Sequence, residues 1–203
     1  LMTLPNKLTI GRIAAVPAMI VVECIPYLRD TAMFATGYGF MSIANFINII
    51  IFVLAAFTDF LDGKIARKRN LVTTFGKFAD PLADKMLVLI SLMILMNQGK
   101  IVTVGIDFRL VPMWGLAIIL IRELTISGIR LVAAQRGEVI AAGWAGKVKT
   151  FVTMIAIFVL FFGGLWKIVD FIGVILMYVS IFLTVYSGAI YMYNSRHLLF
   201  ESM

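Results

Sequence analysis

Apolar residues along this chain are gathered into six long runs, separated by short segments that contain charged residues, glycine or proline. Each run holds roughly 15 to 25 residues, close to the length that an α-helix needs to cross the hydrocarbon core of a bilayer. The runs cover Leu8–Leu28, Met41–Phe60, Leu82–Met96, Leu110–Ala134, Val148–Trp166 and Phe171–Tyr193. The pattern predicts an all-α membrane protein with six transmembrane helices.

A short polar segment, Pro5–Thr9, lies at the start of the first run. Proline is favoured in the first turn of a helix, and a polar side chain beside it can act as a cap. We therefore expect a short N-terminal interfacial segment, which is either a turn or the helix start. Because no repeat, low-complexity tract or long linker divides the sequence, residues 1–203 are predicted to form one domain.

Basic residues are distributed unevenly over the connections between the runs. The connections after the second and fourth runs hold Lys64, Arg67, Lys68, Arg69, Lys77, Arg136, Lys147 and Lys149. The opposite connections hold only Arg29, Lys100, Arg109 and Lys167. Since cytoplasmic loops carry the excess of Lys and Arg, the first group is predicted to face the cytoplasm, and an even number of spans places both termini there. The expected location is the cell membrane, in a multi-pass arrangement.

The overall composition agrees with a membrane protein. Of 203 residues, 62% are hydrophobic and only 14% are charged, which leaves too little polar surface for a soluble globule. The net charge of +7 is also seen in nucleic-acid-binding proteins, but basic residues that flank apolar spans typically face anionic lipid head groups. The lipid bilayer is therefore the predicted partner, and no nucleic acid is expected.

Four aspartates stand at the edge of the second and third runs. Asp59 and Asp62 are three residues apart, and Asp80 and Asp84 are four apart, so each pair shares a helix face. They could be helix caps or surface ion pairs, but at helical spacing only Lys77 is placed to neutralise one of them. A carboxylate inside a membrane costs about 2.5–3.5 kcal/mol, so a cation must compensate. Oxygen donors without His or Cys suit Mg²⁺ or Mn²⁺, with two ions sharing a carboxylate as one arrangement.

A strip of small residues accompanies the first acidic pair. Gly63 follows Asp59 by four residues and Ala66 follows Asp62 by four, so all four lie on one helix face. Small residues at this spacing often serve close helix packing. Beside carboxylates they also make a bed for a bulky ligand, and a metal-bound pyrophosphate lying there would be within reach of Arg67.

Between the two acidic pairs, Gly76 is expected to supply a turn before the third span. Pro81 is then expected at the start of the following helix. A fifth acid, Glu23, interrupts the first run, where it either lies at the hydrated outer end or pairs with a polar group of another helix.

A basic cluster involves the fourth and fifth runs. Arg122 and Glu123 are neighbours inside an apolar stretch, and Arg130 shares a helix face with Glu123. Lys147 and Lys149 open the fifth run, where the positive-inside rule alone could account for them. An intramembrane arginine is a functional residue by default, and several cations near a metal site suit an acceptor that carries its own phosphate.

The acidic residues resemble a known signature. Asp-x-x-Asp-Gly-x-x-Ala-Arg, eight further residues and Gly-x-x-x-Asp-x-x-x-Asp are similar at every fixed position to the motif of the CDP-alcohol phosphotransferase family. The resemblance implies two divalent ions, held chiefly by Asp59, Asp62 and Asp80. It also implies that Asp84 is the catalytic base that activates the acceptor hydroxyl, and a further metal ligand. The implied CDP-lipid site comprises Gly63, Ala66, Arg67, Gly76, Asn6 and Thr9.

Three further stretches are similar to the branch of this family that uses sn-glycerol 3-phosphate as acceptor. They are Leu-Pro-Asn-Lys-Leu-Thr-Ile-x-Arg, Arg-Glu-Leu-Thr-Ile-Ser-Gly-Ile-Arg and Gly-Lys-Val-Lys-Thr. The implied reaction converts CDP-diacylglycerol and sn-glycerol 3-phosphate into phosphatidylglycerol phosphate and CMP at the cytoplasmic face, by a homodimeric enzyme. The implied acceptor-phosphate site comprises Arg122, Arg130, Lys147, Lys149 and Thr150.

Two alternatives differ from this hypothesis. A related phosphotransferase could use inositol phosphate, phosphatidylglycerol or serine, although a basic cluster argues against serine because serine carries no phosphate. A divalent-cation transporter could also place carboxylates in the membrane. Against transport, the acids stand at the edge of the spans and the second half of the chain repeats no acidic pair.

Overall fold

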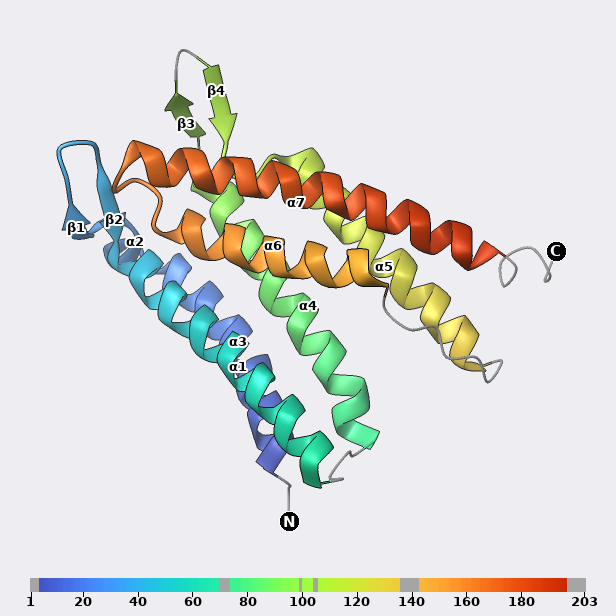
Figure 1. Ribbon diagram of the computed structural model, residues 1–203. Helices are drawn as coiled ribbons and strands as arrows, with labels where there is room; N and C mark the ends of the chain where they lie inside the picture. Colours follow the sequence, from blue (N-terminus) through green and yellow to red (C-terminus); the bar gives the residue numbers. More distant parts are fainter. Residues whose placement is uncertain (1–3, 70–73, 99, 104–105, 136–142, 197–203) are drawn as a thin grey trace.

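The computed structural model describes residues 4–69, 74–98, 100–103, 106–135 and 143–196, and describes side chains for 8–59, 79–98, 110–135 and 143–196. Six long helices dominate these residues (Figure 1). They are α1 (Leu4–Cys24), α3 (Ile43–Arg69), α4 (Thr74–Asn97), α5 (Met113–Gln135), α6 (Trp144–Phe161) and α7 (Lys167–Asn194). The shorter elements are α2 (Pro26–Asp30), β1 (Ala32–Ala35), β2 (Phe40–Ser42), β3 (Lys100–Thr103) and β4 (Ile106–Arg109).

Each of the six apolar runs coincides with one long helix, which confirms the mostly helical architecture. Among the described helices, α6 and α7 are long and apolar enough to cross a membrane, and in α3 the apolar stretch Ile43–Asp59 is shorter. By contrast, α4 and α5 carry charged side chains within their apolar sequence. Buried charges also come from other helices, such as Arg12 of α1 and Lys149 of α6.

The helix boundaries correct two expectations. Helix α4 begins at Thr74, so Gly76 is its third residue rather than a turn, and Pro81 lies inside the helix rather than at its start. Proline removes one backbone donor and crowds the carbonyl four residues earlier, yet the helix runs through Pro81 as far as Asn97. At the other end of the sequence, α1 runs without a break from Leu4, which makes Pro5–Thr9 a helix start rather than a separate turn.

The helices pack in two groups that share one core. Helix α1 lies against α3 and α4, and α6 lies against α7, which also contacts α5 (Figure 1). The shared core is formed by buried residues from every long helix, including Met19, Phe52, Leu92, Ile119, Ile157 and Met177. Close approach depends on small residues: a Cβ added at Gly173 of α7 would lie only 2.6 Å from Leu160 of α6. Such van der Waals packing holds helices together in lipid, where apolar burial gives little driving force.

Two β-hairpins lie at one end of the bundle. The strands pair antiparallel, β1 with β2 and β3 with β4. The first hairpin is fixed to the α6–α7 turn because the Thr36 hydroxyl donates to the Leu165 carbonyl at 2.6 Å. Gly164 in that turn has φ +86°, and a Cβ added at Gly39 would lie 2.6 Å from its carbonyl oxygen, so both positions need glycine. Figure 1 shows the α6–α7 turn beside this hairpin.

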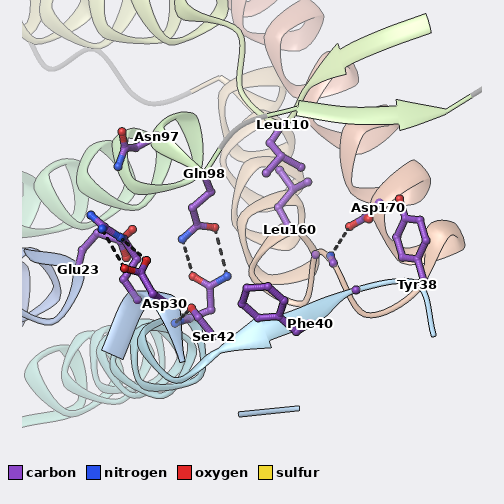
Figure 2. Close-up of a pocket in the computed structure, with 15 residues that line it drawn as sticks. Glu23, Asp30, Tyr38, Phe40, Ser42, Asn97, Gln98, Leu110, Leu160 and Asp170 are labelled. Carbon is purple, nitrogen blue, oxygen red and sulfur yellow. Dashed lines mark hydrogen bonds and ion pairs between the residues drawn. The ribbon is translucent and has the colours of Figure 1, made fainter. Parts of the chain in front are cut away.

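A polar pocket of about 690 Å³ lies at this end (Figure 2). Asn45 and Gln98 form a reciprocal amide pair on its wall, with donor–acceptor distances of 2.5 and 3.2 Å. Glu23 also lines the pocket, is buried, and accepts a hydrogen bond from the Asn48 side chain at 3.5 Å. Of the two explanations for Glu23, the structure therefore shows pairing with a polar group of another helix.

Candidate active site

Three of the four motif aspartates converge on Arg12 of α1. The Arg12 Nη1 atom donates to Asp59 of α3 and, at 2.8 Å, to Asp84 of α4. Its Nη2 atom donates to Asp80 at 3.2 Å. Thr9, one turn before Arg12 on the same face of α1, donates its hydroxyl to Asp80 at 2.6 Å. We call Arg12, Asp59, Asp80 and Asp84 the acidic cluster.

The acidic cluster combines a buried cation with accessible acids. The Arg12 side chain is 1% exposed, whereas the carboxylates of Asp59, Asp80 and Asp84 are 36%, 45% and 43% exposed. Three carboxylates therefore face a single guanidinium and remain open to the surface. Because like charges repel, the excess negative charge of the cluster favours the approach of further cations.

The donor atoms of the acidic cluster fit a hard divalent ion in kind. Carboxylate oxygens are the ligands that Mg²⁺ and Mn²⁺ prefer in proteins. Within the part of the chain whose side chains are described, no three Asp, Glu, His or Cys side chains form a complete metal site. Asp62, the fourth carboxylate of the motif, lies outside the described side chains. The metal-ligand roles of the aspartates thus stay a prediction.

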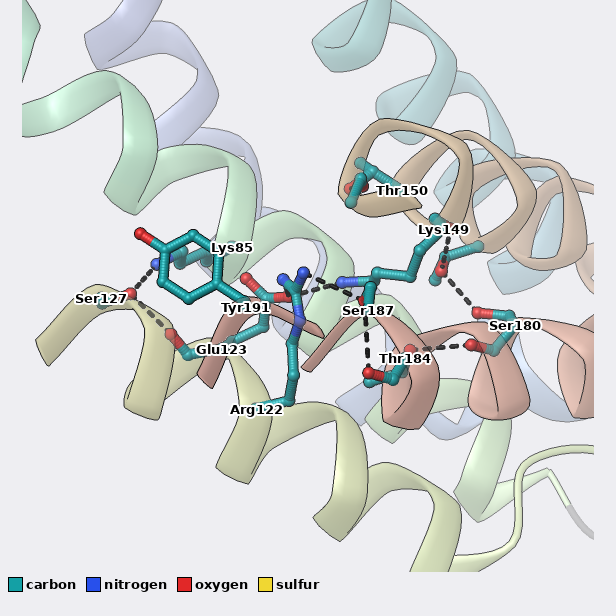
Figure 3. A network of polar contacts seen from close by, with 12 residues as sticks. Lys85, Arg122, Glu123, Ser127, Lys149, Thr150, Ser180, Thr184, Ser187 and Tyr191 are labelled. Carbon is teal, nitrogen blue, oxygen red and sulfur yellow. Dashed lines mark hydrogen bonds and ion pairs between the residues drawn. The ribbon is translucent and has the colours of Figure 1, made fainter. Parts of the chain in front are cut away.

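A second polar site surrounds Glu123 of α5 (Figure 3). Its Oε1 atom accepts from Arg122 of the same helix at 2.8 Å and from Lys149 of α6 at 2.5 Å. The Lys149 side chain is only 5% exposed, which makes this an ion pair inside the bundle. One carboxylate therefore holds two cations, one from each of two helices.

Arg122 occupies a narrow space between α6 and α7. Its Nη2 atom donates to the Ser187 hydroxyl at 3.2 Å. A Cβ added at Gly188 would lie 3.2 Å from Arg122 Cγ, and one added at Gly146 would lie 3.4 Å from Nη2. The absence of side chains at these two positions leaves the room through which the guanidinium reaches Glu123.

Two more cations belong to the same region. Lys85 of α4 donates to the Ser127 hydroxyl, which in turn donates to the Glu123 backbone carbonyl at 2.6 Å. Arg130 donates its Nε–H to the Tyr191 hydroxyl at 3.3 Å, and its guanidinium also lies over that ring. The group that we call the basic network comprises Lys85, Arg122, Glu123, Arg130 and Lys149. It sets four cations against one carboxylate, so its net charge is positive.

The other residues predicted for the two sites have no described contact with the acidic cluster or the basic network. Lys147 is exposed, and among the described side chains no hydrogen bond or ion pair joins it to the basic network. Thr150 is exposed and donates its hydroxyl to the Gly146 carbonyl of its own helix at 3.0 Å. The side chains of Asn6, Asp62, Gly63, Ala66, Arg67 and Gly76 lie outside the described ones. The predicted roles of all these residues are not decided by the contacts.

Sequence reasoning missed Arg12 and Lys85. Arg12 is 47 residues from Asp59, so no helical spacing connects the two. A signal was nevertheless present, because Arg12 interrupts an apolar run and lies one turn after Thr9. Lys85 directly follows Asp84 and resembles an ordinary charge at the edge of a span. Only the packing of α4 against α5 shows which neighbours it meets.

Comparison with known proteins gives consistent matches over nearly the whole chain. A family model described as CDP-alcohol phosphatidyltransferase matches residues 2–186. The chain is 40% identical over 187 residues to the CDP-diacylglycerol–glycerol-3-phosphate 3-phosphatidyltransferase of Bacillus subtilis, covering 91% of each chain. Proteins of the same name from Rickettsia bellii and Wigglesworthia glossinidia brevipalpis are 36% and 34% identical, with coverage of 92% or more of both chains. These matches confirm the family resemblance that the aspartate motif indicated.

Proposed function

Because this chain belongs to the CDP-alcohol phosphatidyltransferase family, we propose that it transfers the phosphatidyl group of CDP-diacylglycerol to sn-glycerol 3-phosphate. The products are phosphatidylglycerol phosphate and CMP. The observation that carries the proposal is the juxtaposition, along α4, of an acidic cluster with excess negative charge and a basic network with excess positive charge. The first suits a metal-bound pyrophosphate, and the second suits a phosphorylated acceptor.

The reaction is a displacement at the phosphorus that carries the lipid. The acceptor hydroxyl oxygen bonds to this phosphorus, the bridging bond of the pyrophosphate breaks, and CMP leaves with the electron pair. Asp84 takes the hydroxyl proton in this proposal, the role that the family resemblance implies for the last carboxylate of the motif, and its side chain is 43% exposed. Arg12 holds Asp84 and Asp59 at one nitrogen atom, and Thr9 fixes Asp80, so the carboxylates are oriented before substrate arrives.

Mg²⁺ or Mn²⁺ completes the site in this proposal, with Asp59, Asp62 and Asp80 as main ligands and Asp84 as an additional one. Two such ions, when bound, neutralise the pyrophosphate oxygens and stabilise the departing CMP. The CDP moiety lies along Gly63 and Ala66, with Arg67 on its phosphates. Gly76, Asn6 and Thr9 complete its surroundings, and the contact of Thr9 with Asp80 supports a place for Thr9 at this site.

The acceptor phosphate binds to Arg122, Arg130 and Lys149 of the basic network in this proposal. Arg122 and Lys149 share the carboxylate of Glu123, and Arg130 lies on the Tyr191 ring and hydroxyl. A phosphate dianion would balance their excess charge, and arginine matches its oxygens with paired donors. Lys147 and Thr150, both exposed, are assigned to the entrance of this site.

The membrane arrangement forms part of the proposal. The six long helices span the cell membrane, both termini and the active site face the cytoplasm, and the enzyme is a homodimer. The support is the concentration of basic residues in the connections after the second and fourth long helices, and the location of the β1–β2 hairpin and the α6–α7 turn at one common end.

The test is product formation by detergent-solubilised protein from CDP-diacylglycerol, with the lipid product identified by mass spectrometry. Glycerol 3-phosphate, inositol phosphate, serine and phosphatidylglycerol are offered one at a time. We expect CMP and phosphatidylglycerol phosphate with glycerol 3-phosphate alone. A different lipid product would replace the proposed acceptor but keep the transfer reaction, whereas no CMP with any acceptor would contradict both.

A further inference from the structure

Lys85 stands directly after Asp84 in α4, and the two side chains serve different neighbours. Asp84 faces Arg12 of α1, whereas Lys85 donates to Ser127 of α5. Successive residues on a helix point about 100° apart, which accounts for this divergence. One turn of α4 therefore contributes a carboxylate to the acidic cluster and an ammonium group to the basic network.

The charge of Lys85 is not balanced by its contacts. Within the part of the chain that the structure describes, no carboxylate lies within ion-pair distance of Lys85, and its hydrogen-bond partner is the neutral hydroxyl of Ser127. In contrast, Arg122 and Lys149 share the carboxylate of Glu123. An ammonium group in a half-buried position of an intramembrane helix is costly when it meets only a hydroxyl. An anionic ligand would remove this cost.

We propose that Lys85 binds the phosphate of the acceptor, and that its position beside Asp84 sets which acceptors the enzyme accepts. This inference rests on the proposed function. Glycerol 3-phosphate carries a hydroxyl and a phosphate on one three-carbon chain, so its two ends must be held close together. Lys85 leaves Ser127 for a phosphate oxygen, while the neighbouring Asp84 receives the hydroxyl at the other end.

Lys85 is expected to discriminate between acceptors with and without a phosphate. An acceptor that lacks a phosphate cannot use Lys85, so loss of the ammonium group penalises glycerol 3-phosphate and leaves glycerol unaffected. The ratio of kcat/KM for these two acceptors is therefore the quantity that Lys85 controls. A purely structural role, in which Lys85 only ties α4 to α5 through Ser127, would lower both values together.

The experiment compares Lys85→Met with Lys85→Arg, Ser127→Ala and Lys167→Met in detergent-solubilised protein. For Lys85→Met we expect the KM for glycerol 3-phosphate to rise about 10- to 100-fold, the loss typical of a charge-assisted hydrogen bond. The KM for CDP-diacylglycerol should stay within about twofold, and Lys85→Arg should recover most of the loss because the charge remains.

Two variants serve as controls. Ser127→Ala removes the partner that Lys85 has in the structure and should change the KM for glycerol 3-phosphate by less than about threefold. Lys167→Met removes a lysine that lies over the Tyr38 ring, 5.5 Å from its centroid, at the hairpin end of the molecule, and should behave like wild type. A second readout is independent of turnover: glycerol 3-phosphate should raise the unfolding temperature of wild type but not of Lys85→Met.

The outcomes separate this inference from the proposed function. If wild type forms no product from glycerol 3-phosphate, both are overturned. If wild type is active, the inference alone is overturned by an unchanged KM in Lys85→Met, by an equal rise in both KM values, or by Ser127→Ala reproducing the effect. Should Lys85→Met fail to fold, Lys85→Arg and Ser127→Ala decide: a large effect in Ser127→Ala contradicts the inference, and near-normal kinetics in both support it.

Discussion

The acidic cluster and the basic network have opposite charge ratios within one bundle. In the first, three carboxylates from α3 and α4 face the single guanidinium of Arg12. In the second, four cations from α4, α5 and α6 accompany the single carboxylate of Glu123, and two of them, Arg122 and Lys149, form ion pairs with it. Each site therefore contains one residue of the opposite charge, Arg12 in the acidic cluster and Glu123 in the basic network. This residue orders the side chains that contact it but does not neutralise the charge of the whole site. The remaining charge is what attracts a ligand of the opposite sign.

The two sites also differ in exposure. The carboxylates of the acidic cluster are more than one third exposed, while Glu123 is 16% and Lys149 5% exposed. Open carboxylates suit ions and a large nucleotide-lipid that arrive from the surface. In the basic network Arg130 is exposed, but the more enclosed pair of Glu123 and Lys149 suits a small acceptor that must be held away from water while it reacts. The difference in exposure thus supports the proposed assignment of CDP-diacylglycerol to the acidic cluster and of glycerol 3-phosphate to the basic network.

The largest expected effect comes from lowering the charge of the acidic cluster. Asp59→Asn keeps the shape of the side chain but removes a carboxylate that faces Arg12. Turnover, measured as CMP release, should fall about 1000-fold because charge stabilisation at the phosphate is lost. Asp30→Asn, at an exposed aspartate paired with Arg29, is the matched control and should retain full activity. Near-normal turnover in Asp59→Asn would exclude Asp59 as a metal ligand.

Removal of the positive charge of Arg12 tests whether this residue holds the three carboxylates of the acidic cluster in place. Arg12→Met leaves Asp59, Asp80 and Asp84 without their shared cation, and should lower the free energy of unfolding by about 2 kcal/mol. This loss is smaller than that of a fully buried ion pair because the carboxylates remain partly solvated. Thermal unfolding in detergent measures this change, and Mg²⁺ should stabilise the variant more than wild type. Equal stabilisation of both proteins by Mg²⁺ would contradict the role of Arg12 in offsetting the charge of the three carboxylates.

A moderate effect is expected in the basic network. Lys149→Met removes one of two cations on Glu123 but leaves the pair with Arg122 intact, so the fold should persist. The KM for glycerol 3-phosphate should rise about tenfold, with little change in the KM for CDP-diacylglycerol. Steady-state kinetics with each substrate varied in turn provide the measurement. If both constants rise equally, Lys149 has no special relation to the acceptor.

The smallest effect concerns the space around Arg122. A Cβ added at Gly188 would lie 3.2 Å from Arg122 Cγ, so Gly188→Ala should displace the side chain by a few tenths of an ångström. We expect a two- to threefold rise, about 0.5 kcal/mol, in the KM for glycerol 3-phosphate. Gly128→Ala, where an added Cβ meets no atom within 4 Å, is the control. Identical kinetics for the two variants would show that Arg122 tolerates displacement.

Much of the architecture could be predicted because it depends on local patterns. The six long helices follow from apolar runs of membrane-spanning length, and the pairing of aspartates on shared faces follows from helical spacing. The C-terminal end of α3, at Arg69, and the N-terminal end of α4, at Thr74, could not be predicted from the apolar runs. Both helices continue through charged sequence, where the apolar signal stops but the backbone hydrogen bonds do not.

Contacts between distant helices were beyond the reach of spacing rules. Helical spacing offers the aspartates only Lys77 as a neighbouring cation, whereas Arg12 of α1 holds three of the carboxylates. In the basic network, Glu123 and its neighbour Arg122 were recognised as a unit. The link from Lys85 to Ser127 depends on how α4 crosses α5, which no single-helix pattern contains.

The central claim is that each site binds a ligand opposite to its own excess charge, and thermal unfolding with separate ligands tests it most directly. Mg²⁺ and glycerol 3-phosphate are added separately to wild type, Asp59→Asn and Lys149→Met, and the unfolding temperature is recorded. We predict that both ligands stabilise wild type, that Asp59→Asn loses only the response to Mg²⁺, and that Lys149→Met loses only the response to glycerol 3-phosphate. Loss of both responses in either variant, or of neither in both, would contradict the account.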